Sequence, residues 1–141
     1  MSTQNIHPNA IVEDGAYVHP SAIVGDGARV GDGAYVDPRA RIGSGAHVKP
    51  GAIIGCGAII GRDAIVGRGA IVGRGAIVDD GAYVDRRAYV GPRARVGPRA
   101  RVGSGALVER DVIVEAGAVV EAGAIVEAGV RVEPGAVVRR S

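Results

Sequence analysis

The sequence predicts an all-β protein that coils as one repetitive solenoid, and three observations carry this prediction. The chain has 141 residues with 24 Gly and 7 Pro, but it has no Phe and no Trp. An Ala or Val recurs at every sixth residue from Ala10 to Ala136, and a Val or Ile follows two residues after each of them. All Gly and Pro residues fall in the three-residue segments between these triplets. Such a repeat, without large aromatic side chains, indicates a narrow interior filled by Ala, Val and Ile.

Each hexad divides into a triplet and a corner. In the triplet, the alternation of a strand points the small and the Val/Ile residue inward and the middle residue outward, so we expect three strand residues per hexad. In the corner, Pro or a polar residue is followed by Gly, Asn or Asp, which tolerate a positive φ. Four corners carry Arg39, Arg87, Arg93 and Arg99 at the Gly position. A non-Gly residue there costs about 1 kcal/mol, so these corners are either mildly strained or use a different turn.

Every hexad points the same two positions inward, so all corners must turn the chain in the same direction. Hexads follow one another from Ala10 to Ser141 without an insertion, after a less regular copy at 4–9. Three hexads per coil place residues 18 apart on neighbouring parallel strands, about 4.8 Å from each other. We therefore expect about 7 to 8 coils, with residues 1–9 as a lead-in and 10–141 as a single domain. Helices are excluded because Gly or Pro recurs too often for a helical run to nucleate.

The order of an aliphatic residue, Gly or an acid, two turn residues and a small residue resembles the hexapeptide repeat of left-handed parallel β-helix proteins. Its regularity is also typical of an idealised or designed member. The segment IHPNAIVEDGAYVHPSAIVGDGA, at 6–28, resembles the opening of UDP-N-acetylglucosamine acyltransferases. The resemblance implies a left-handed coil of triangular section. It also implies acyl transfer to a sugar or amino hydroxyl or amine, from an acyl-CoA or acyl-carrier donor, by a His acting as general base between subunits.

Few residues could carry such chemistry. His47 lies at an outward strand position and is the candidate general base. His7 and His19 precede Pro at different corners, and we interpret them as turn residues. The γ-class carbonic anhydrases share the resembled fold and hold zinc with three His between subunits, but no close His pair occurs here, so we predict no metal ligand and no cofactor. Cys56 lies in a corner without a nearby His and is predicted to be inert.

Sorting the outward residues by 18 gives three faces, and one of them is apolar from end to end. A continuous exposed apolar stripe usually marks association, so we predict a homo-oligomer, with a side-by-side trimer favoured by the resemblance. End-to-end stacking through open strand edges is the alternative. The predicted interface residues are Tyr17, Tyr35, Ile53, Ile71, Tyr89, Leu107 and Ile125.

The charges are nearly balanced, with 17 Lys and Arg against 15 Asp and Glu. This balance does not indicate a nucleic-acid or membrane partner. Nine Arg stand against four Asp between Arg62 and Arg101, and this belt is either solvated charge or an anion-binding surface. No apolar run is long enough to span a bilayer and no signal peptide is evident, so we expect a cytoplasmic protein.

The leading functional hypothesis from the sequence is a structural scaffold whose readable activity is self-association. It rests on a repeat that occupies the chain without a loop, cleft or cofactor motif. The alternative is an acyltransferase of the hexapeptide family, with its site near His47 and the Arg belt. A further alternative is a metal site between subunits like that of the γ-class carbonic anhydrases.

Overall fold

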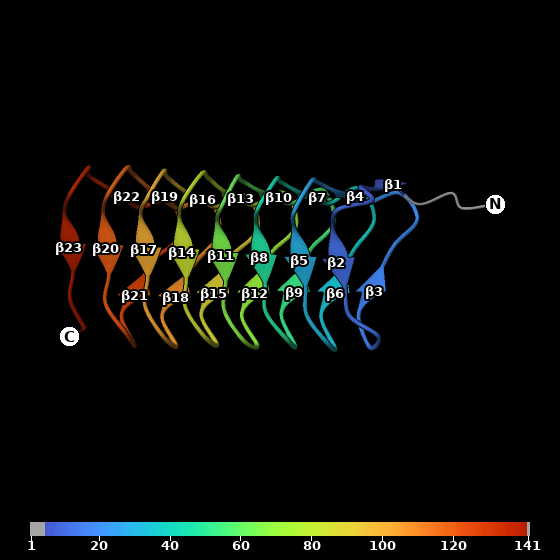
Figure 1. Cartoon of the computed structure of the whole chain (residues 1–141). Coiled ribbons are helices and arrows are strands. Elements are labelled where there is room, and N and C mark those ends of the chain that lie inside the picture. Colours follow the sequence, from blue (N-terminus) through green and yellow to red (C-terminus); the bar gives the residue numbers. More distant parts are fainter. Residues whose placement is uncertain (1–4, 141) are drawn as a thin grey trace.

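The structure is a computed structural model in which residues 5–140 are described, and it confirms the β-solenoid. The described chain forms 23 strands of two residues each and no helix (Figure 1). Strands that are three apart in sequence are hydrogen-bonded neighbours, so they assemble into three parallel sheets along the solenoid axis. Three sheets around one interior agree with the triangular section that the resemblance implies. None of the described residues forms a helix that could cross a membrane.

The three sheets are named here A, B and C. Sheet A contains β1 (Asn5–Ile6), β4 (Ile23–Val24), β7 (Arg41–Ile42), β10 (Ile59–Ile60), β13 (Ile77–Val78), β16 (Arg95–Val96), β19 (Ile113–Val114) and β22 (Arg131–Val132). Sheet B contains β2 (Ile11–Val12), β5 (Arg29–Val30), β8 (His47–Val48), β11 (Ile65–Val66), β14 (Tyr83–Val84), β17 (Arg101–Val102), β20 (Val119–Val120) and β23 (Val137–Val138). Sheet C contains β3 (Tyr17–Val18), β6 (Tyr35–Val36), β9 (Ile53–Ile54), β12 (Ile71–Val72), β15 (Tyr89–Val90), β18 (Leu107–Val108) and β21 (Ile125–Val126).

The strand register confirms the predicted spacing of 18 residues. His47 pairs with Arg29 on one side and with Ile65 on the other. Backbone hydrogen bonds follow the same lattice, since the N–H of Arg29 donates to the carbonyl of Ala46 at 2.9 Å. Outward side chains with this spacing therefore form straight columns on each sheet.

The strands are shorter than predicted, with two residues instead of three. The small residue of each triplet is shared between strand and corner. The N–H of Ala46 donates to the carbonyl of Gly43 at 3.1 Å and closes the preceding turn, while the carbonyl of Ala46 accepts the ladder bond from the previous coil. Only one of its two backbone groups is thus available for the sheet.

The corners use one main turn geometry, with Pro or a polar residue second and a left-handed residue third, as in type II turns. Gly51 has φ 76° and follows Pro50. The four Arg corners adopt this turn too, so the alternative of a different turn is wrong and the mild strain is present. Positive φ at non-Gly residues occurs at Arg39 (63°), Asp63 (58°), Arg87 (56°), Arg93 (60°), Arg99 (57°) and Asp111 (60°).

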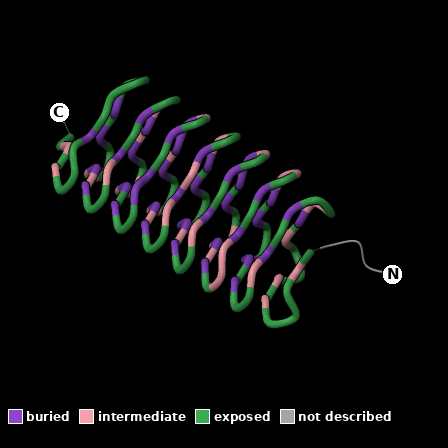
Figure 2. The backbone as a smooth tube through the Cα atoms, turned by 90° about the horizontal axis from the view of Figure 1, so that it is seen from above, coloured by how far each residue is buried: buried purple, intermediate pink, exposed green. Residues whose placement is uncertain are grey.

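The interior consists of stacked Ala and Val/Ile columns, and buried residues, coloured purple in Figure 2, recur in every coil of the backbone. Ile42, Ile54 and Ile60 are the largest fully buried side chains. No polar or charged side chain within the described chain is buried. Functional side chains therefore have only two places: the outward strand positions and the corners.

Candidate functional site

His47, the candidate general base, lies on the outer face of sheet B and is partly buried. This burial lowers the pKa of the imidazole, and the positive charges of Lys49 and Arg29 lower it further, while Glu13 opposes them. The ring forms no side-chain hydrogen bond with any residue in 5–140. The lowered pKa favours the neutral imidazole, which is the form that a general base needs.

The other two His are engaged at corners. The Nδ1 of His7 accepts a hydrogen bond from the N–H of Asn9 at 3.0 Å and lies 3.6 Å from the Oδ1 of Asp26. The Nδ1 of His19 accepts from the N–H of Ser21 at 3.1 Å. Across residues 5–140 no three His, Cys, Asp or Glu side chains are grouped closely enough to hold a metal ion.

A small hollow of about 140 Å³ lies at the corner that follows sheet B, and Lys49, two residues after His47, is part of its lining. We call it the basic hollow, because three cations and one carboxylate line it. The cations come from three successive coils and, in the described part of the chain, form no ion pair. Its lining residues are Lys49, Gly67, Arg68, Tyr83, Asp85 and Arg86.

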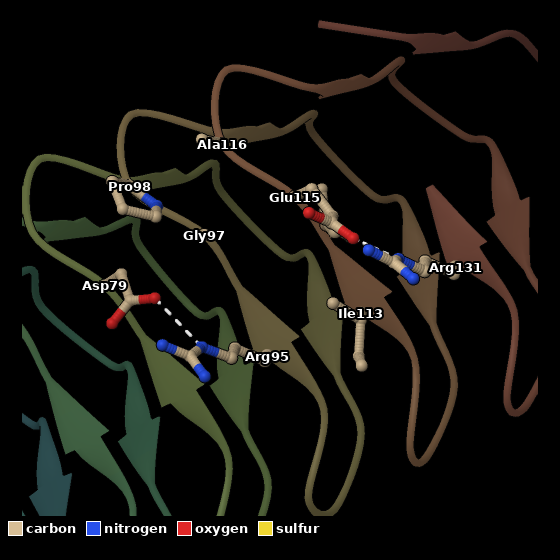
Figure 3. Close-up of a pocket in the computed structure, with 9 residues that line it drawn as sticks. Asp79, Arg95, Gly97, Pro98, Ile113, Glu115, Ala116 and Arg131 are labelled. Carbon is tan, nitrogen blue, oxygen red and sulfur yellow. Dashed lines mark hydrogen bonds and ion pairs between the residues drawn. The ribbon is translucent and has the colours of Figure 1, made fainter. Parts of the chain in front are cut away.

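A larger hollow of about 530 Å³ lies on sheet A and is named the sheet A hollow (Figure 3). Its Arg side chains are paired. The Nε of Arg95 donates to the Oδ2 of Asp79 at 3.1 Å, and Arg131 donates in the same way to Glu115. In both pairs the acid precedes the Arg by 16 residues, so it lies at the corner of the previous coil. The charges neutralise each other, and no His lines this hollow.

The predicted apolar column runs along sheet C, as its register requires. The rings of Tyr17 and Tyr35 stack with their centroids 4.8 Å apart. Ile53 is 39% exposed, and Ile125 is 61% exposed. The structure thus places the seven predicted interface residues on one face, away from His47 on sheet B.

The outward strand positions, sorted by 18, place His47 and Tyr83 in one column on sheet B, and the register confirms it. Lys49 was not predicted to act on His47, because it is a corner residue and lies outside these columns. Sorting the corner residues in the same way would have placed Arg68 and Arg86 in register, with Lys49 one coil before them. The Arg belt was visible in the sequence, but its division into paired and unpaired cations was not.

Comparison with known proteins identifies the fold. No protein family profile matches the sequence, and no curated protein matches it. Solved structures do match, and those found are hexapeptide-repeat acyltransferases. The chain therefore has the β-solenoid fold of this class of enzymes.

Two solved structures illustrate the similarity to this chain. A variant of GDP-perosamine N-acetyltransferase from Caulobacter crescentus, solved with CoA and GDP-perosamine, is 28% identical with a TM-score of 0.69. The match covers 86% of this chain and 51% of the neighbour, so this chain spans about half of that enzyme's length. UDP-N-acetylglucosamine acyltransferase from Francisella novicida is 18% identical with a TM-score of 0.54, and the match covers 94% of this chain and 62% of that enzyme. The second match shows the shared fold alone.

Proposed function

We propose that this chain is an acyltransferase that moves an acyl group from a thioester donor to a hydroxyl or amine, with His47 as general base. One observation carries the proposal: the partly buried imidazole of His47, whose pKa is lowered, lies on the outer face of a solenoid that is 28% identical to an N-acetyltransferase solved with CoA. The scaffold hypothesis that led from the sequence is not confirmed. The comparisons favour the acyltransferase alternative instead.

The chemistry requires one proton acceptor and a thioester. The acceptor oxygen or nitrogen attacks the thioester carbonyl while the His47 imidazole takes its proton. The carbon–sulfur bond then breaks, and the leaving thiolate takes that proton from the imidazolium. The products are an ester or amide and a free thiol, and the imidazole returns to its neutral state. The lowered pKa of His47 keeps the base unprotonated before each turnover.

Self-association belongs to the same proposal. The sheet C stripe is continuous and partly exposed, which supports a side-by-side trimer in which neighbouring solenoids complete the cleft that sheet B lacks alone. End-to-end stacking stays the competing prediction, and so does a metal site between subunits. The expected cytoplasmic location also stays a prediction.

Thiol release measures the proposed activity. Acetyl-CoA is offered with a panel of amino sugars, amines and sugar hydroxyls, and free thiol is followed by a colorimetric reagent. We expect acceptor-dependent release that falls at least about 100-fold in His47→Ala, the lower range for loss of a general base. His19→Ala removes an imidazole at a remote corner and serves as the control. Equal activity in His47→Ala, or no acceptor-dependent release in the wild type, would contradict the proposal.

Sedimentation measures the association. Ile53 on sheet C and Ile59 on sheet A are 39% and 40% exposed, so they form a matched pair. We expect a trimer for the wild type and for Ile59→Arg, and a monomer for Ile53→Arg, since a buried unpaired charge is costly at an interface. A wild-type monomer at micromolar concentration overturns the trimer, and a mass that grows steadily with concentration supports end-to-end stacking.

A further inference from the structure

We infer that the basic hollow binds the phosphate groups of small soluble ligands, namely phosphate esters and diphosphates. The inference concerns the corner after sheet B and does not require that the chain catalyses acyl transfer. Three features carry it: cations without partners, a backbone donor without an acceptor, and a space that fits a phosphate group.

The first feature is the absence of internal neutralisation. Lys49, Arg68 and Arg86 form no ion pair within residues 5–140, whereas Arg93 binds Asp111 at 3.0 Å. Asp85 is the one acid in the lining, and its Oδ1 accepts from the N–H of Arg86 at 2.9 Å. Three cations and one carboxylate leave the hollow with a net positive charge.

The second feature is a backbone donor. At the corner after sheet A, the N–H of Arg62 donates to the Oδ1 of Asp80 in the next coil at 2.9 Å. Arg68 holds the equivalent position at the corner after sheet B, but the residue that stands in the place of Asp80 is Arg86. The N–H of Arg68 has no acceptor in the described part of the chain. An external anion can take the place that the Asp80 carboxylate occupies at the corner after sheet A.

At two other corners the second residue also donates to a carboxylate, which there comes from the preceding coil. The N–H of Asp32 donates to the Oε1 of Glu13 at 2.9 Å, and the N–H of Ala128 donates to the Oε1 of Glu109 at 3.2 Å. The second corner residue thus repeatedly presents an N–H to an anionic oxygen. At the basic hollow the donor is present and the acceptor is missing.

The third feature is the space itself. Gly67 is buried in the lining, and a Cβ on it would lie 2.6 Å from the backbone nitrogen of Arg86. The hollow of about 140 Å³ equals the liquid volume of roughly five water molecules. This is room for a phosphate group rather than for a whole nucleotide. Arg68 and Arg86 lie in register on neighbouring coils, about 4.8 Å apart along the backbone lattice. An anion between them would relieve their mutual repulsion and accept charge-assisted hydrogen bonds from both guanidinium groups.

Titration with inorganic pyrophosphate at low ionic strength tests the inference, by calorimetry and by the amide NMR signals. We expect binding that shifts the Arg68 amide and leaves the Arg62 amide, whose acceptor is Asp80, in place. Arg86→Gln should weaken binding about tenfold, the scale of one charge-assisted hydrogen bond. Arg74→Gln is the matched control, because Arg74 has the same corner position on another edge, is exposed and forms no ion pair in the described chain.

Each outcome decides. Absence of pyrophosphate binding to the wild type overturns the inference, and so does equal weakening by Arg74→Gln and Arg86→Gln, which would show diffuse charge attraction. A second arm offers vesicles that contain phosphatidic acid. Binding to vesicles without binding to pyrophosphate overturns the assignment to soluble ligands. Both variants change exposed side chains, and unchanged thermal unfolding confirms that they fold.

Discussion

The sheet A hollow and the basic hollow lie on the same backbone lattice and differ in their charges. In the sheet A hollow, Arg95 and Arg131 each bind a carboxylate from the previous coil. In the basic hollow, Arg68 and Arg86 bind none within residues 5–140. The backbone ladder is the same in both places. Single residues at fixed spacings therefore determine whether a hollow is neutral or positively charged. In a solenoid of this regularity, the side chains at the corners therefore determine which surface can bind a charged ligand.

The largest expected effect comes from a side chain at Gly67, in the lining of the basic hollow. Its Cβ would lie 2.6 Å from the backbone nitrogen of Arg86, so the backbone of Arg86 would have to shift. We expect Gly67→Ala to lower the free energy of unfolding by about 3 kcal/mol, the upper range for overpacking, and to abolish pyrophosphate binding. Urea unfolding and pyrophosphate titration measure the two effects.

Gly69, at the same corner, provides the control for Gly67→Ala. It has φ 66°, and a Cβ on it would have the Cγ of Arg87 as its nearest neighbour, at 3.6 Å. Gly69→Ala should therefore cost only the left-handed backbone penalty, about 1 kcal/mol. An equal loss of stability in the two variants would show that contact between the coils does not matter at Gly67.

The second prediction converts one hollow into the other. Asp79→Asn with Glu115→Gln releases Arg95 and Arg131, and we expect the sheet A hollow to gain weak pyrophosphate binding. The stability cost should be small, about 1 kcal/mol or less per pair, because exposed ion pairs contribute little. Asp37→Asn with Glu127→Gln changes the net charge equally without releasing a paired Arg and serves as the control. Equal gain of binding in the control would show that net charge alone attracts the anion.

Most of the fold was predictable from the sequence, because the position of a residue in the hexad determines whether its side chain points inward or outward. The columns on sheets A, B and C, the Val/Ile and Ala core and the number of coils all follow from a spacing of 18 residues. The two-residue strands were not predicted, because the N–H of a small residue such as Ala46 closes a turn instead of joining the ladder. Asp63 and Asp111 also adopt positive φ at corners that the sequence analysis did not single out.

The candidate site was predicted less well than the fold. His47 was found because it is the only His at an outward strand position. The residues around it were not predicted. Contacts between side chains of different coils depend on side-chain length and direction as well as on the strand register. Arg95 extends back 16 residues to Asp79, not 18, and this diagonal cannot be read from columns alone. Whether a cation is paired or free, and hence where chemistry can occur, depends on such diagonals.

The smallest expected effect is the change in the pKa of His47 when the positive charge of Lys49, in the lining of the basic hollow, is removed. The pKa of His47 is lowered first by burial, then by Lys49 and Arg29. We expect Lys49→Gln to raise this pKa towards the ordinary value of 6.5, and Arg74→Gln to leave it unchanged. An NMR titration of the imidazole measures it. A pKa that stays the same or falls in Lys49→Gln would show that the cations of the hollow do not act on the candidate base.

The same shift makes stability depend on pH with a defined sign. Because the folded pKa of His47 lies below the unfolded one, the unfolded chain binds the proton first as the pH falls through 6.5. Folding stability is therefore lost below this pH until the folded imidazole is protonated too. We expect His47→Gln to reduce the loss of unfolding free energy on acidification, and Lys49→Gln to reduce it by less, since burial is the larger cause of the shift. A steeper acid loss in His47→Gln would contradict a lowered pKa, and with it the uncharged state on which general-base action by His47 depends.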